Sequence, residues 1–160
     1  MILNNFNIAV IGLKARQDRW DRCVEIFEEI GVTKVTRITT VQDMEDSHRG
    51  YMKDFLMMLR KFQGADLMFF EDDFELIDGW EDILRKAWSE LPKDYDMLYL
   101  GCNLTRVSPK VSDTLIRVKG AWLMHATILS KKFIKYILDN YDRNRIWIID
   151  EWYRQIAPGM

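Results

Sequence analysis

The chain has 160 residues, with 23 Lys and Arg against 25 Asp and Glu, so its formal net charge is −2. Hydrophobic residues make up 48% of it and charged residues 30%, which excludes a disordered chain and is typical of a globular protein. The length predicts a single domain over residues 1–160, and the near-neutral charge excludes a general attraction for nucleic acid. No apolar run approaches the roughly 18 residues of a membrane span, and the N-terminus lacks the pattern of a signal peptide.

The cysteines and histidines restrict the kinds of metal site that the chain could form. Cys23 and Cys102 have no C-x-x-C spacing, which predicts two free thiols in a reducing compartment and therefore a cytoplasmic location. Nothing in the spacing of these cysteines and the two histidines supports a zinc site. A bound metal would have to be held by carboxylates, which favours Mn²⁺ or Mg²⁺.

In the first part of the chain, short apolar runs alternate with amphipathic segments. Residues 7–12 form an apolar run that predicts a buried strand. Apolar residues then recur at spacings of three and four over residues 20–30, which predicts a helix that ends at Gly31. A second strand is expected over residues 33–38, where β-favouring residues alternate with polar ones.

The middle of the chain repeats this alternation. Ser47 is expected to cap a helix that ends at Gly64, and residues 66–70 predict a third, buried strand. Asp78, with Glu81 three residues later, resembles a capping box and predicts the start of the next helix, which Pro92 ends.

Strands cluster in the last part of the chain. They are expected over residues 96–101, 114–118 and 123–129, and Ser130 is expected to cap a final helix. This order predicts an α/β sandwich with a mostly parallel sheet and some antiparallel strands late in the chain. Ligands of such sheets bind beyond the carboxyl ends of the strands. That rule singles out residues 14–19, residues 71–73 and the loop from Cys102 onward.

The most informative stretch is the third strand and the three acids that follow it. Glu71, Asp72 and Asp73 come directly after four apolar residues, and such close like charges require compensation. Because alternate residues project to the same side, Glu71 and Asp73 could face one divalent cation while Asp72 points elsewhere. The competing interpretation is a solvated acidic turn before a helix, which needs no ligand.

A basic turn follows the first strand. Arg16 and Arg19 lie just before or within the expected start of a helix, where cations oppose the helix dipole, so they suit an anionic ligand. The alternative is a solvated turn in which Arg19 pairs with an acid. The chain has no G-x-G-x-x-G and no P-loop motif, which disfavours dinucleotide and Walker-type sites.

Other candidate residues carry a weaker signal. His48, beside the capping Ser47, fits a structural role better than a functional one. His125 lies within an apolar strand, so a buried core histidine is the default interpretation and a third metal ligand is the alternative. Asp150 ends an apolar run, where a raised pKa would suit a general base; helix capping is the competing role.

Taken in order, these segments resemble glycosyltransferase family 25, which includes lipooligosaccharide and collagen galactosyltransferases. Residues 10–19 are similar to the family's opening I-N-L-x-x-R-x-D-R, and residues 39–48 to a segment that ends in S-H. Residues 68–73 resemble its hydrophobic-E-D-D motif, residues 96–101 its W-D-x-x-x-L-G segment, and residues 125–131 its H-A-Y-x-x-S. Asp150 falls where the family has a late Asp. The chain departs from the pattern at three positions. Gly12 replaces the usual Asn, Asp46 stands near the position of the family's Cys, and Thr127 replaces the usual Tyr.

The resemblance implies a GT-A-like, Rossmann-like three-layer sandwich that transfers a hexose from a UDP-sugar to a hydroxyl acceptor with inversion, as in lipopolysaccharide biosynthesis. It implies Mn²⁺ or Mg²⁺ as the cofactor. It also implies that a C-terminal segment shaping the acceptor side is missing after residue 160. It assigns residues to three roles. The metal ligands are Glu71, Asp73 and His125; the residues that bind the nucleotide-sugar donor are Arg16, Arg19, Ser47, His48 and Asp72; the catalytic base is Asp150 or Glu151.

Two other functions remain open from the sequence. One is a binding module of the same fold that holds a nucleotide-sugar or a glycan without turning it over. The other is a metal-dependent phosphohydrolase built on the same acids, although no convincing nucleophile or second metal cluster accompanies them.

Overall fold

The computed structural model describes residues 2–40, 47–106, 109–141 and 151. One 3₁₀ helix, four α-helices and five strands lie in these ranges, in the following order: η1 (Ile2–Asn5), β1 (Asn7–Leu13), α1 (Gln17–Glu29), β2 (Val35–Thr40), α2 (Ser47–Phe62), β3 (Leu67–Glu71), α3 (Trp80–Glu90), β4 (Met97–Leu104), β5 (Ala121–Leu129) and α4 (Lys131–Asn140).

The five strands form one mixed sheet in the order β2-β1-β3-β5-β4. β1 pairs in parallel with both β2 and β3, whereas β5 runs antiparallel to both β3 and β4. The α/β class is therefore confirmed. The expectation of a mostly parallel sheet with antiparallel strands late in the chain holds in part: the sheet is mixed, two of these four pairings are antiparallel, and both of them involve β5.

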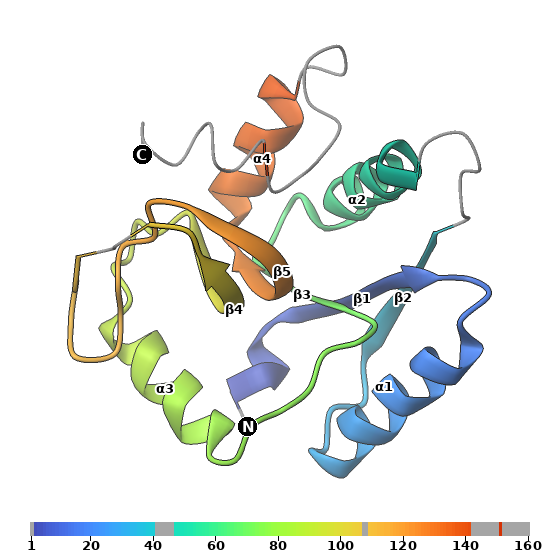
Figure 1. The fold of residues 1–160 in the computed structure, drawn as a ribbon, viewed down its shortest axis with the longest axis horizontal. Coiled ribbons are helices and arrows are strands. Elements are labelled where there is room, and N and C mark those ends of the chain that lie inside the picture. The colour runs from blue at the N-terminus through green and yellow to red at the C-terminus, as the bar shows by residue number, and fades with distance from the viewer. Residues whose placement is uncertain (1, 41–46, 107–108, 142–150, 152–160) are drawn as a thin grey trace.

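Helices cover both faces of the sheet (Figure 1), with α2 and α4 on one side and α1 and α3 on the other. The alternation within β1 explains this arrangement. Ala9 and Ile11 join the core cluster under α2 and α4, whereas Ile8 and Val10 join the cluster under α1 and α3. A strand that is apolar on both faces requires cover on both faces, so the sheet is the middle of three layers.

Two local expectations fail. Asp78 does not cap α3, because the N-cap is Gly79 in the left-handed region (φ 73°), which has no side chain to accept a capping hydrogen bond. Residues 114–118 do not form a strand; their one ladder contact is an isolated antiparallel bridge between Lys110 and Ile116. The expected cap of the last helix is confirmed, since Ser130 Oγ accepts a hydrogen bond of 3.2 Å from the Phe133 amide.

The sheet topology brings the candidate segments to one edge. The carboxyl ends of β1 and β3 lie side by side because these strands are parallel. β5 is antiparallel to β3, so its first residues lie at the same edge. β4 also points that way, since Met97 and Leu67 both pair with Leu129 at the opposite end. Within the described ranges, no helix has the length and apolarity needed to cross a bilayer.

Candidate functional site

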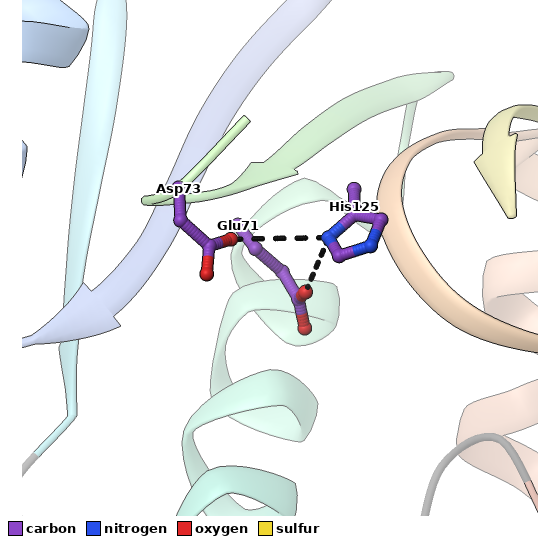
Figure 2. A group of neighbouring side chains, drawn as sticks. All are labelled: Glu71, Asp73 and His125. Atoms are coloured by element: carbon purple, nitrogen blue, oxygen red, sulfur yellow. Dashed lines mark ion pairs between the residues drawn. The ribbon is translucent and has the colours of Figure 1, made fainter. Parts of the chain in front are cut away.

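A cluster of Glu71, Asp73 and His125 lies at this edge of the sheet. Phe70 pairs with Ala126 across the β3–β5 ladder, so the next residue of β3, Glu71, meets the preceding residue of β5, His125. Figure 2 shows both carboxylates directed at the same imidazole nitrogen. His125 Nδ1 lies 3.4 Å from Glu71 Oε2 and 3.8 Å from Asp73 Oδ1.

The exposure of these three side chains leaves the cluster open to solvent. The His125 side chain is 44% exposed, Glu71 31% and Asp73 46%. The default interpretation of His125 as a buried core histidine is therefore wrong: the residue lies in the middle of β5, one residue beyond the last pair of the β3–β5 ladder, and its side chain is partly exposed.

The structure adds Tyr51 to this cluster. Its hydroxyl donates a hydrogen bond of 3.2 Å to Glu71 Oε1, the oxygen that does not face His125. Tyr51 lies on α2 one turn after Ser47, and its ring packs against the core under α2 and α4. An anchored ring with a donor at its tip fixes the direction of the Glu71 carboxylate.

Asp72 points to the opposite face of the sheet, toward α1. A Cβ atom built on Gly12 would lie only 2.6 Å from the Asp72 Cβ and would also overlap its carboxylate. The Asp72 side chain thus occupies the space that any larger residue at position 12 would need. Its backbone oxygen accepts a contact of 3.6 Å from Cys23 Sγ, and burial, with the charges of Asp72 and Asp73, raises the pKa of that thiol to about 11.

Arg19 links the two groups of acids. Its Nη1 donates to Asp72 Oδ1 at 2.9 Å and to Asp73 Oδ2 at 3.2 Å. The hydrogen bond to Asp72 raises the pKa of Arg19. The sequence left open whether Arg19 meets an anionic ligand or an acid of the chain, and in this structure it meets two acids.

Arg16 lies farther out on the same side. It forms hydrogen bonds to Asp18 from both Nε and Nη2, and this pairing lowers the pKa of Asp18 to about 2. The pKa of Arg16 is raised, first by Asp18 and at longer range by the charges of Asp72 and Asp73. Arg16 is therefore paired with Asp18 and lies within electrostatic reach of Asp72 and Asp73.

The other residues predicted for the site are Ser47, His48, Asp150 and Glu151. Ser47 and His48 begin α2, the helix that carries Tyr51, and His48 is exposed. Asp150 lies outside the described residues. Glu151 is described and half-buried. The assignment of a catalytic base to either residue stays a prediction.

The three candidate ligands, Glu71, Asp73 and His125, fit a small divalent cation. The three side chains each offer one ligand atom, and these atoms lie within 4.8 Å of one another. Two atoms that each bind one ion at about 2.1 Å lie at most about 4.2 Å apart, so small rotations of the exposed carboxylates would complete such a site. Two carboxylates and an imidazole suit Mn²⁺, and a protonated His125 would hold the same carboxylates without a metal.

Comparisons with known proteins add no assignment, because no protein-family model and no curated protein sequence matches this chain. Sequence patterns missed Tyr51 and Gly12. The hydroxyl of a tyrosine on an apolar helix face signals a buried partner, but no sequence signal links Gly12 to Asp72, since the contact joins neighbouring strand ends.

Proposed function

We propose that this chain is a metal-dependent glycosyltransferase with a GT-A-like fold, which transfers a hexose from a UDP-sugar to a hydroxyl acceptor with inversion. The observation that carries this proposal is the convergence of Glu71, Asp73 and His125 at the carboxyl edge of the sheet. Open α/β sheets bind their ligands at that edge. The order of motifs that resembles glycosyltransferase family 25 supports the same function.

In this proposal Glu71, Asp73 and His125 hold Mn²⁺ or Mg²⁺. The ion supplies charge neutralisation at the diphosphate leaving group. Tyr51 keeps one oxygen of Glu71 engaged, so that the other stays directed at the site. The negative charge of the acids is balanced by Arg19 and, farther out, by Arg16. The guanidinium groups of both arginines suit phosphate oxygens.

The acceptor side depends on a base. Asp150, or its neighbour Glu151, takes the proton of the acceptor hydroxyl as that oxygen attacks the anomeric carbon and the bond to UDP breaks. Ser47, His48 and Asp72 complete the proposed donor site, with Asp72 near the ribose or the sugar. The donor hexose, glucose or galactose, and the glycan or other hydroxylated acceptor are left to assay.

Calorimetry with UDP in the presence and absence of Mn²⁺ tests the proposal. We expect Mn²⁺ to strengthen UDP binding, and Asp73→Asn to abolish that enhancement. Asp94→Asn is the matched control, because Asp94 is an exposed acid just before β4, at the opposite end of the sheet. UDP binding that is indifferent to Mn²⁺, or equal in Asp73→Asn and wild type, would remove the metal from the account.

A transfer assay separates the enzyme from a binding module. Release of UDP from a UDP-hexose that depends on both Mn²⁺ and an acceptor supports the transferase. Metal-dependent binding with no UDP release across a panel of donors and acceptors favours the module, and release of inorganic phosphate from simple phosphoesters favours the phosphohydrolase.

A further inference from the structure

Of the three consecutive acids, Asp72 differs from its neighbours in burial and in contacts. Its side chain is 12% exposed, compared with 46% for Asp73. Its carboxylate lies over Gly12 and against Arg19, on the α1 side of the sheet. The fit over Gly12 leaves it little room to turn toward the cluster of Glu71, Asp73 and His125.

Asp72 and Asp73 share one arginine, Arg19, which donates hydrogen bonds to both carboxylates. The shorter contact, 2.9 Å, goes to Asp72 and the longer one, 3.2 Å, to Asp73. On Asp73 the arginine takes Oδ2, whereas Oδ1 is the oxygen nearest His125. The guanidinium group is therefore held at the edge of the candidate metal site without filling it.

Removal of the Asp72 carboxylate would change how Arg19 is shared between Asp72 and Asp73. An arginine that loses its nearer carboxylate pairs fully with the remaining one, because a fork of two N–H groups matches both carboxylate oxygens. Arg19 would then engage Asp73 alone and compete with a cation for it. The charge on Asp73 is available to a cation only while Arg19 has another partner.

We infer that Asp72 is a positioning residue, which retains Arg19 on the α1 side of the sheet and so leaves Asp73 free to bind a divalent cation. Gly12 contributes to the same positioning, because only a residue without a side chain leaves space for the Asp72 carboxylate. This role rests on the proposed metal site and assigns Asp72 a function that needs no contact with the donor.

A double-mutant cycle on Mn²⁺ affinity, read from the electron paramagnetic resonance signal of free Mn²⁺, tests the inference without any activity assay. We expect Asp72→Asn to weaken Mn²⁺ binding about tenfold in the wild-type background, and at most about twofold when combined with Arg19→Gln, since coupled charges give non-additive effects of this size. Thermal melts of each variant establish that the weakening is not unfolding.

A second variant removes the contact without removing a charge. Gly12→Ala forces β1 or the end of β3 to shift, and the Asp72 carboxylate with it, so we expect it to weaken Mn²⁺ binding more in the wild-type background than in the Arg19→Gln background. Gly101→Ala on β4, where an added Cβ meets nothing within 4 Å, is the matched control.

The outcomes separate the inference from the proposed function. An equal loss of affinity from Asp72→Asn in both backgrounds means that Asp72 acts on the cation directly, and overturns the inference while the metal site stands. No loss in either background overturns it as well. If neither wild type nor Arg19→Gln binds Mn²⁺, both the inference and the proposed metal site fall.

Discussion

The contact between Gly12 and Asp72 makes Gly12→Ala the most informative substitution for stability. The added methyl group would lie 2.6 Å from the Asp72 Cβ, closer than two carbon atoms can approach without repulsion. Both Cβ positions are set by the backbone, so rotation of a side chain cannot relieve this overlap. Either β1 or the end of β3 must shift.

The expected cost follows from three contributions. Overpacking of this kind costs about 1–3 kcal/mol. Loss of the partly exposed ion pair between Asp72 and Arg19 costs at most about 1 kcal/mol more. The lower conformational entropy of Ala in the unfolded chain offsets about 0.4–1 kcal/mol of this loss of stability. The net loss is about 2 kcal/mol, which lowers the melting temperature of a chain of this length by about 4–8 °C.

Urea unfolding and thermal melts measure this effect, with Gly101→Ala as the control. Gly101 also lies on a strand, but its added Cβ meets nothing within 4 Å, so we expect that variant to match wild type or gain about 0.4–1 kcal/mol. A Gly12→Ala protein as stable as Gly101→Ala, with an unchanged dependence on urea, would refute the reasoning about the close approach of β1 and Asp72.

Three further predictions concern single contacts. Ser130→Ala should lower the free energy of unfolding by about 1 kcal/mol through loss of the α4 cap, and urea unfolding unchanged from wild type would contradict this role. Burial and the hydrogen bond to Asp66 raise the pKa of Tyr95 above its ordinary value of 10.0, so this contribution to stability is complete below pH 10 and is lost as pH rises further. An ultraviolet titration should show one late-ionising tyrosine that Tyr95→Phe removes; its persistence in that variant would assign it elsewhere. The pKa of Asp18 is lowered from 3.8 to about 2 by Arg16, so its stabilising contribution is present above pH 3.8 and is lost as pH falls toward 2. An NMR titration of Arg16→Gln should return that pKa toward 3.8, and an unmoved value would exclude Arg16 as the cause.

Local patterns predicted the elements that depend on local physics. The apolar run at residues 7–12 and the one before Glu71 are both strands buried on two faces, and the spacing after Gln17 gives α1. Cys23 and Cys102 form no disulfide, as their spacing indicated. These elements are governed by burial of alternate or helical faces, which the sequence records directly.

The position of β5 depended on long-range pairing and could not be predicted in the same way. Strand propensity does not specify a partner or a direction, so the insertion of β5 between β3 and β4 was not foreseen. That insertion is also what brings His125 to Glu71. A histidine in an apolar run is expected to be a core residue, and only the strand register shows that His125 lies one residue beyond the last pair of the β3–β5 ladder.

The failed helix cap has a simpler cause. Asp78 had the right residue type and the right spacing to Glu81, but the chain turns through Gly79 at φ 73°, a conformation that glycine adopts at little cost. The capping pattern and the glycine turn competed for neighbouring positions, and the glycine turn determined where α3 begins.

The central claim is that Glu71, Asp73 and His125 bind one divalent cation at the edge of the sheet. Crystals of the protein grown with MnCl₂ and UDP, measured for anomalous scattering of manganese, test it most directly. The account predicts one strong peak about 2.0–2.3 Å from a carboxylate oxygen of Glu71, a carboxylate oxygen of Asp73 and a ring nitrogen of His125. Ordered side chains in their present contacts, with no manganese peak between them, would contradict it.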